Sequence, residues 1–199
     1  MPVTAVTPVM VALDRLLAQA VLRALLAVGA RDLALRQADQ QLARDPYNRH
    51  ALATRAHVWA GQGRHREALA DLARLVQLAP DQAGAWFNLG FVQEWLGDAS
   101  AAAASFSRAV ALAPGMDRAW YGLGLCHIRL GQWDDAVTAL TRTTELQPMG
   151  PNGWYQLARV HLERGEPERA RRVLRHLHRF EPKVAAQLER ETGLRAGIA

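Results

Sequence analysis

This chain repeats itself every 34 residues, and that period limits what it can fold into more than any other feature. Prolines, glycines and alanines each recur at this step. The prolines are Pro46, Pro80, Pro114, Pro148 and Pro182; the glycines are Gly29, Gly63, Gly97, Gly131 and Gly165; the alanines are Ala34, Ala68, Ala102, Ala136 and Ala170. Chance does not keep three columns in register over so many copies, so we interpret the chain as a repeat protein.

Large and small apolar residues follow the same period. The large column is Leu52, Trp86, Trp120 and Trp154; the small column is Ala56, Gly90, Gly124 and Ala158; two more apolar columns are Leu72, Phe106, Leu140, Leu174 and Leu78, Leu112, Leu146, Phe180. We expect the small column to let the two helices of a unit approach closely. We expect the tryptophan column to fill the gap between units.

Each unit has the sequence pattern of two helices joined by a glycine. In one unit, apolar residues recur at helical spacing over 83–96, and Gly97 follows. Glycine ends helices readily because the left-handed conformation costs it nothing sterically. Asp98 is placed to cap a second helix over 99–111, which ends before Pro114. Since a lone helix pair cannot bury both of its faces, we expect the pairs to stack into a solenoid.

The columns resemble the tetratricopeptide repeat (TPR) family, whose pattern is W-x2-L-G-x2-Y…A-x3-F…P. The pattern appears as Trp86, Leu89, Gly90, Ala102, Phe106, Pro114; as Trp120, Leu123, Gly124, Ala136, Leu140, Pro148; and as Trp154, Leu157, Ala158, Ala170, Leu174, Pro182. The tyrosine column departs from it, with Trp59, Gln93, His127 and His161. The first full unit has Leu52 for tryptophan and Arg55 for leucine. The resemblance implies an all-α fold, a right-handed α-solenoid of stacked helix-turn-helix units with a C-terminal capping helix.

The repeat also predicts where the parts of the chain begin and end. We expect an extended segment over residues 1–14, a degenerate TPR-like helix pair over 15–48 and four TPR units over 49–182. The four units cover 49–82, 83–116, 117–150 and 151–182. A capping helix over 183–192 and a tail complete residues 183–199.

Composition excludes several classes of protein. A single cysteine, Cys126, rules out an internal disulfide framework and a multi-cysteine metal site. The formal net charge of +5 is diluted by 19 acidic residues, so we do not expect a nucleic acid partner. The most apolar stretch, residues 9–30, is interrupted by Asp14, Arg15 and Arg23, so we expect no membrane span. No Lys or Arg precedes that stretch, and we expect a cytoplasmic protein.

No arrangement of residues predicts catalysis, a bound metal or another cofactor. His127 and His161 occupy a packing column, and His176 and His178 are two apart, which turns them to different faces of a helix. Cys126 shares its column with valines, so we expect it to be buried. The chain has no phosphate-binding glycine motif and no nucleophile elbow. We therefore expect no enzyme activity.

The resemblance implies a binding surface, because in this family the first helix of each unit lines a concave groove. Helical geometry gives ten candidate residues exposed in that peptide-binding groove. They are Phe87, Asn88, Phe91, Arg118, Tyr121, Leu125, Arg129, Asn152, Tyr155 and Arg159, with Ile128 and Leu162 beside them. Aromatic residues and arginine are enriched at binding hot spots. The competing interpretation is that some of these residues pack against the next unit.

Two further regions leave alternatives open. Residues 167–180 carry five arginines against one acid, Glu168, which fits a patch for an acidic protein or a nucleic acid, or a solvated outer helix. The apolar segment over residues 9–28 has more hydrophobic residues than one face of a surface helix requires. It packs over the first unit, pairs with a second copy, or inserts into a partner.

From these features we hypothesise a non-enzymatic protein–protein interaction module that binds a peptide or helix in its concave TPR groove. Such a module serves as a scaffold, an adaptor or an assembly factor. The alternative is a self-assembling structural TPR protein that uses its apolar N-terminal helix, so a homo-oligomer stays open.

Overall fold

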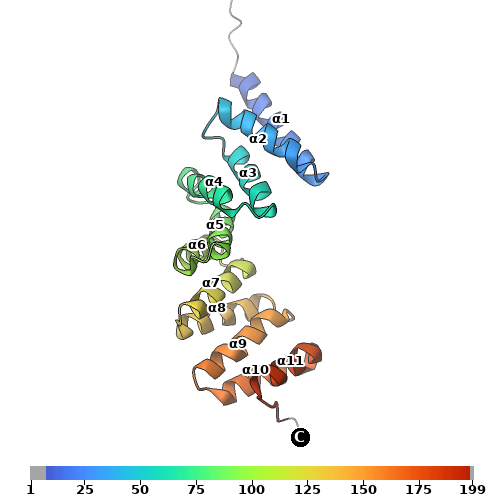
Figure 1. The fold of residues 1–199 in the computed structure, drawn as a ribbon, viewed down its shortest axis with the longest axis vertical. Helices are drawn as coiled ribbons and strands as arrows, with labels where there is room; N and C mark the ends of the chain where they lie inside the picture. The colour runs from blue at the N-terminus through green and yellow to red at the C-terminus, as the bar shows by residue number, and fades with distance from the viewer. Residues whose placement is uncertain (1–7, 198–199) are drawn as a thin grey trace, which may run out of the picture. The chain divides into compact units, whose positions relative to one another are not determined.

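The computed structural model describes residues 8–197, and within them the chain is all helical, with eleven α-helices and no strand (Figure 1). The helices are α1 (Pro8–Ala27), α2 (Arg31–Arg44), α3 (Arg49–Gly61), α4 (His65–Leu78), α5 (Ala83–Trp95), α6 (Ala99–Leu112), α7 (Asp117–Arg129), α8 (Trp133–Leu146), α9 (Pro151–Glu163), α10 (Pro167–Phe180) and α11 (Pro182–Thr192). The all-α repeat fold predicted from the period is confirmed. None of the described helices is both long and apolar enough to cross a membrane.

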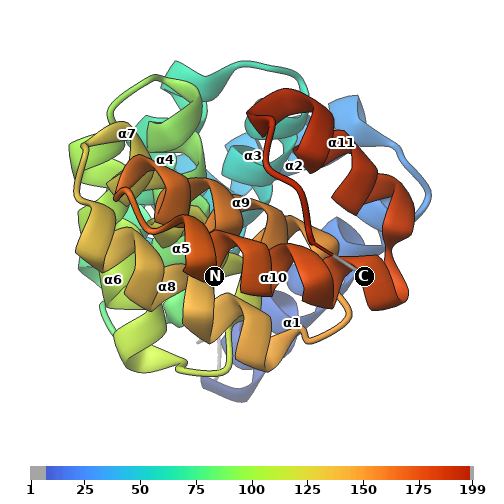
Figure 2. The same ribbon diagram turned by 90° about the horizontal axis from the view of Figure 1, so that it is seen from below.

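The helices form two compact units, divided between residues 81 and 82. In the first unit α2 packs on α3 and α3 on α4, while α1 contacts both α2 and α3. In the second unit α5 to α10 form three consecutive pairs, and each helix packs on the next one along the chain. The last helix, α11, packs on both α9 and α10 (Figure 2).

The in-phase glycines end the first helix of each pair as the sequence predicts. Gly29, Gly63, Gly97, Gly131 and Gly165 all have a positive φ, between 69° and 86°. At Gly97 the glycine N–H donates to Glu94 and the following N–H, of Asp98, donates to Gln93, both at 3.0 Å. This pair of bonds is a Schellman motif, and it recurs at the other four glycines. Asp98 then caps α6, because its carboxylate accepts from the N–H of Ala101 at 2.9 Å.

The small column holds the helices of a pair at close range, which confirms its predicted role. A Cβ atom placed on Gly90 of α5 would lie 2.9 Å from the Phe106 ring on α6. A Cβ on Gly124 would lie 2.8 Å from Leu140. Phe106 also meets a second glycine, because a Cβ on Gly122 of α7 would lie 2.7 Å from the same ring. One buried aromatic ring is therefore held between α5 and α7 at two positions without side chains.

Two rings of the tryptophan column have contacts within their own helix pair. The Trp154 ring stacks on His176 of α10, with centroids 4.3 Å apart, and Trp120 lies beside α8 residues such as Val137. Both rings therefore contact the second helix of their own pair, and the core clusters on which they pack also include residues of the preceding pair, as the prediction of a ring between units requires. The indole N–H groups donate to Pro148 and Pro114 at 2.9 Å, which ties each ring to the preceding loop. Both side chains stay half-buried because this position lies at the surface of the pair.

The arginine that replaces leucine in the first full unit has a partner of its own. Arg55 of α3 donates two hydrogen bonds of 2.7 Å to the carboxylate of Asp71 on α4, and a third to Asp39 on α2. Asp71 is buried, so its charge requires such a partner. The hydrogen bond to Asp71 is the main reason that the pKa of Arg55 is raised. One departure from the repeat pattern thus links three helices of the first unit.

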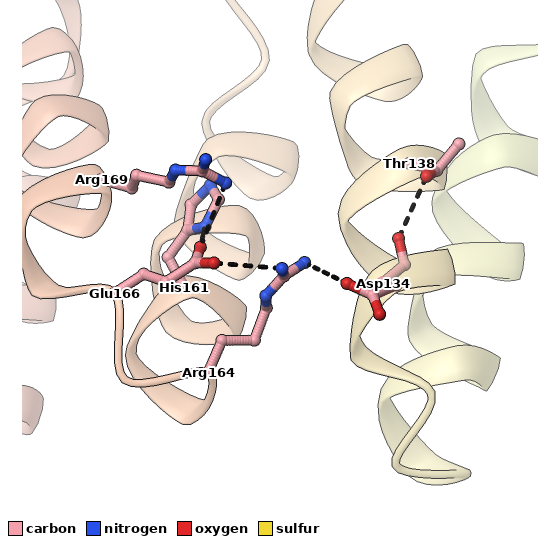
Figure 3. A network of polar contacts seen from close by, with 6 residues as sticks. All are labelled: Asp134, Thr138, His161, Arg164, Glu166 and Arg169. Carbon is pink, nitrogen blue, oxygen red and sulfur yellow. Dashed lines mark hydrogen bonds and ion pairs between the residues drawn. The ribbon is translucent and has the colours of Figure 1, made fainter.

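A polar network joins two consecutive pairs of the second unit. Arg164, at the end of α9, contacts Asp134 of α8 at 2.6 Å and Glu166 at 3.0 Å (Figure 3). The Glu166 carboxylate also contacts His161 at 2.8 Å and Arg169 at 3.4 Å. The hydrogen bond to His161 is the main cause that lowers the pKa of Glu166. The packing role expected for His161 is therefore accompanied by a structural hydrogen bond.

The N-terminal boundary differs from the sequence prediction. Residues 8–14 were expected to be extended, but α1 already begins at Pro8, and residues 1–7 lie outside the described part. A proline fits the first turn of a helix because an N–H at that position would make no hydrogen bond within the helix. The helix can therefore begin at Pro8. The helix buries Leu22 fully and Leu25 and Leu26 partly, while Leu16 and Leu17 remain more than half exposed.

We predict that Gly90→Ala destabilises the protein by about 1–2 kcal/mol, measured as the free energy of unfolding in urea. In a helix interior, alanine normally increases stability by up to about 1 kcal/mol relative to glycine. A decrease in stability would therefore be due to the clash with Phe106. The matched variant is Gly90→Ala with Phe106→Leu, which rebuilds the Ala158–Leu174 pair of the last unit. The double variant should be more stable than the sum of the two single changes by about 1 kcal/mol or more. Strict additivity would contradict the close-approach interpretation.

Candidate functional site

The ten candidate groove residues lie on the first helices of the three pairs in the second unit, α5, α7 and α9. We call this set the first-helix surface. Six of its side chains are exposed: Asn88, Phe91, Arg118, Arg129, Asn152 and Arg159. The other four are half-buried: Phe87, Tyr121, Leu125 and Tyr155. The competing expectation, that some of these residues pack within the array, therefore applies to this second group.

Two aromatic side chains on α5 have different surroundings. The Phe87 ring packs on Phe106, with centroids 5.8 Å apart, and the Arg118 guanidinium of α7 lies over it at 5.9 Å. Phe91 is 41% exposed and meets the edge of Trp95, at 6.3 Å. Trp95 is itself 63% exposed. Trp95 was not among the predicted groove residues, although its place one turn beyond Phe91 is a signal that could have indicated it.

Three of the candidate residues come together around one hollow. It has a volume of about 340 Å³, lies where α7, the end of α8 and the start of α9 meet, and we call it the Arg118 hollow. Its lining residues are Asp117, Arg118, Tyr121, Thr143, Gln147, Gly150, Asn152 and Gly153. Arg118, Tyr121 and Asn152 were predicted from the sequence. Thr143, Gln147 and Gly150 were not, because the prediction covered first helices only, whereas Thr143 is on α8 and the other two lie in the connecting loop. Asp117 and Gly153 are on first helices but were not predicted either.

The charges of the first-helix surface are unevenly satisfied. Arg129 of α7 pairs with Glu94 of α5 at 3.5 Å, so part of its charge is neutralised by the protein. Arg159 lies over the ring of Tyr155 at 5.8 Å, and it also interacts with the Tyr155 hydroxyl and with the carboxylate of Glu191. Arg118 makes no ion pair with another residue in the described part of the chain, and it is exposed. Arg118 is therefore the guanidinium on this surface most open to an external carboxylate.

The pKa of each of the two tyrosines of this surface is raised above its ordinary value. Burial raises the pKa of Tyr121, and the nearby Glu94 carboxylate acts in the same direction, while a hydrogen bond with Gln156 opposes them. The pKa of Tyr155 is raised mainly by its hydrogen bond to Glu191, on α11. Because the Tyr155 hydroxyl is already used by the capping helix, a ligand can reach the ring of Tyr155 more readily than its oxygen.

Three of the residues weighed for chemistry in the sequence are buried or hydrogen-bonded within the protein. Cys126 is fully buried on α7. The Nδ1 atom of His127 makes a hydrogen bond of 2.7 Å with Gln132 across the turn, as His161 does with Glu166. At the equivalent position of the first full unit, Trp59 reaches Arg64 across the same turn, at 3.7 Å. Within the described residues, no three His, Cys, Asp or Glu side chains are grouped so that they could hold a metal ion.

Helix pairs at a 34-residue step, closed by recurring glycine caps and presenting one face of their first helices, define a helical-repeat protein. Three profiles described as tetratricopeptide repeat match residues 55–120, 96–154 and 151–190, and the chain belongs to this family. No curated protein sequence matches it.

Several solved structures have a similar fold. YrrB, described as a TPR protein with an unusual peptide-binding site, is 20% identical, with a TM-score of 0.79 over 85% of this chain and 88% of that one. MamA from Desulfovibrio magneticus RS-1 is 20% identical, with a TM-score of 0.74 over 89% and 96%. PilW, described as a widely conserved type IV pilus biogenesis factor, is 20% identical, with a TM-score of 0.72 over 90% and 86%. At this identity the likeness shows the fold alone.

We predict that the buried thiol makes stability depend on pH in the alkaline range. Burial raises the pKa of Cys126 from 9.0 to about 11, and Glu94 adds to this shift. The unfolded chain loses the thiol proton at lower pH, so the native state binds more protons between about pH 9 and 11 and its stability falls across that window. The expected loss from this group is about 2–3 kcal/mol.

The control for this experiment is Cys126→Val, because valine fills the same column at Val58, Val92 and Val160. Urea unfolding of both proteins at pH 8 and pH 11 gives the contribution of the thiol as the difference between the two pH dependences. Equal pH dependences would mean that the Cys126 thiol ionises as readily in the native protein as in the unfolded chain.

Proposed function

We propose that this protein is a non-enzymatic protein–protein interaction module that binds a peptide or a helix of a partner on its first-helix surface. The observation that carries the proposal is the Arg118 hollow, where Arg118, Tyr121 and Asn152 line one space of about 340 Å³. A hollow of this size accommodates one or two side chains of a ligand. The role of scaffold, adaptor or assembly factor follows if that ligand belongs to a larger assembly.

The chemistry of the surface fits a peptide better than a small metabolite. Arg118 offers a guanidinium fork to a carboxylate, and the Asn152 amide can both donate to and accept from a peptide bond. The exposed pair Phe91 and Trp95 provides apolar area on α5 for a second anchoring side chain. Polar groups at one place and aromatic area at another suit an extended or helical ligand that spans both.

Two of the structural neighbours support this direction. YrrB is described by its peptide-binding site, and PilW by a role in type IV pilus biogenesis. Both share the TPR fold with this chain at 20% identity. Because a fold hosts many functions, the proposal depends on the side chains described above and takes only its general class from the neighbours.

We predict that changes on the first-helix surface weaken partner binding. The partner is to be identified by affinity purification and mass spectrometry from the native host, and its binding measured by calorimetry. Phe91→Ala or Tyr121→Ala should each cost about 1–3 kcal/mol, because each removes an anchoring ring. Arg118→Glu should weaken binding more at low salt than at high salt, because the attraction it removes is screened by ions.

Arg108→Glu is the matched control for Arg118→Glu. Arg108 is an exposed arginine on α6, the second helix of its pair, so its replacement changes the net charge equally but away from the first-helix surface. The control should bind the partner with nearly unchanged affinity. If Arg108→Glu abolishes binding while the first-helix variants retain it, the partner binds the second helices and the proposed site is wrong.

Self-assembly is the second candidate function, and the exposed apolar row on α1 favours it. Leu16, Leu17 and Val21 are 62%, 57% and 44% exposed, while the other side of α1 packs on α2 and α3. If this row binds a second copy, solution mass measured by light scattering should rise with concentration. Leu17→Glu should abolish that rise, and Leu33→Glu, a change at an exposed leucine of α2, should not. A wild-type mass that stays monomeric at all concentrations would exclude self-assembly.

A further inference from the structure

A second hollow lies between α9 and α10, the first and second helices of the same pair. Its volume is about 340 Å³, and we call it the Arg172 hollow. It is lined by Trp154, Arg172, Val173, Arg175, His176 and Arg179. Trp154 precedes Tyr155 of the first-helix surface, and adjacent residues of a helix point about 100° apart. The two surfaces are therefore separate, although both use α9.

The same hollow exists one repeat earlier, which gives an internal comparison. There it has a volume of about 430 Å³ and is lined by Trp120, Val137, Thr138, Thr141, Arg142 and Glu145, and we call it the Thr138 hollow. At a step of 34 residues, the positions of Thr138, Thr141 and Glu145 correspond to those of Arg172, Arg175 and Arg179. The repeat thus keeps the space and its tryptophan but replaces two hydroxyls and a carboxylate with three guanidinium groups.

This exchange makes the later hollow cationic. In the Thr138 hollow, Arg142 pairs with Glu145 at 2.8 Å, so the two charges cancel within the protein. The Arg172 hollow has three arginines and no carboxylate in its lining. Arg172 and Arg179 are exposed, and neither makes an ion pair with any other residue that the structure describes. Both are therefore available to an external anion.

The rest of the arginine-rich helix is neutralised, which confines the charge to the hollow. Arg169 pairs with Glu166 at 3.4 Å, and Arg171 forms an ion pair with Glu168. Of the five arginines of α10, these two have their charges balanced by the protein itself. Arg175 donates to the backbone carbonyl of Ala196 at 3.2 Å, which fixes its side chain in place. The excess charge noted in the sequence therefore belongs to one face of α10 and not to the whole helix.

An aromatic wall stands beside these arginines. The Trp154 indole N–H is bonded to Pro148, and its ring stacks on His176 at 4.3 Å, while His176 in turn meets Phe180 at 5.4 Å. The Nε2 atom of His176 is buried and has no hydrogen-bond partner among the described residues. The hollow thus combines apolar ring area with guanidinium groups.

We propose that the Arg172 hollow binds an acidic peptide segment of a partner protein, with an apolar side chain against Trp154 and carboxylates on Arg172 and Arg179. Guanidinium groups pair with carboxylates through two parallel hydrogen bonds, and an aromatic wall favours an apolar neighbour. The two arginines are seven residues apart on α10, which is about 10 Å along the helix. This spacing suits a few successive residues of a peptide.

A nucleic acid or an anionic membrane is disfavoured by the same observations. Both present charge over a longer distance than the Arg172 hollow covers and bind best to a broad basic surface. Here the arginines that would extend the surface toward the start of α10 are paired with Glu166 and Glu168. The charged face is short, and its centre is an aromatic hollow.

The test uses the full-length protein and a labelled, blocked heptapeptide of six glutamates around a central phenylalanine, with binding followed by fluorescence anisotropy. The test variant is Arg172→Thr with Arg179→Glu, which installs the residues of the Thr138 hollow. The expected result is saturable binding to the wild type that weakens about tenfold or more in this variant. A peptide with glycine at its centre should bind more weakly than the phenylalanine peptide.

The matched control is Arg169→Thr with Arg171→Glu, which changes the net charge of α10 by the same amount outside the hollow. Both variants are first compared with the wild type in circular dichroism and thermal unfolding. Equal affinity of the test variant and the wild type, or an equal loss in the control, would overturn the proposal, as would no binding to the wild type. A loss confined to Arg118→Glu would assign the peptide to the first-helix surface and overturn this second site without touching the first.

Competition separates the alternative ligands. Single-stranded DNA and phosphatidylserine vesicles are added to the peptide complex at equal anionic charge. The peptide should remain bound. Displacement of the peptide by either competitor at a lower charge concentration than that of unlabelled peptide would overturn the choice of an acidic peptide.

Discussion

The close approach of the two helices within each pair is the contact on which the second unit depends. Phe106 fits between α5 and α7 because Gly90 and Gly122 have no side chain where the ring lies. A Cβ atom on Gly90 would lie 2.9 Å from the ring, and one on Gly122 would lie 2.7 Å from it. A dense interior has no slack to absorb an extra methyl group, so these positions fix the helices relative to each other. That fixed distance decides which residues of a first helix face the interior and which remain for binding.

The parts of the fold that the sequence predicted are those set by local chemistry repeated in phase. A glycine such as Gly97 ends a helix through its own backbone and the two hydrogen bonds around it, and Asp98 caps the next helix with its own carboxylate. Neither effect requires knowledge of the tertiary structure. The burial of Cys126 was also predicted correctly, because valines occupy the equivalent position in the other full copies and indicate that it is apolar.

The parts that the sequence did not predict depend on which neighbour a side chain meets. A tryptophan column indicates that each copy needs a large ring at this position. The ring of Trp154 lies against His176 of its own pair, and the spacing of the column does not predict which neighbouring helix the ring contacts. Arg55 was noticed only as a departure from the pattern, since its partner Asp71 lies sixteen residues away on another helix. The hollow at Arg118 was found in part, because its lining includes the second helix and loop that the pattern leaves out.

The columns also explain how one small fold can hold two surfaces of different chemistry. The residues that keep their type from copy to copy are used for packing, so the positions between them are free to change without cost to the fold. Between the third and fourth full units, such changes convert a hollow neutralised by Arg142 and Glu145 into one lined by three arginines, while the tryptophan that shapes it stays. On the first helices, the position of Arg118 is Gly84 one copy earlier and Asn152 one copy later, while the position of Tyr121 stays aromatic, as Phe87 and Tyr155. In a chain whose packing is repeated, the differences between equivalent positions are therefore the part of the sequence on which the two proposed binding surfaces depend.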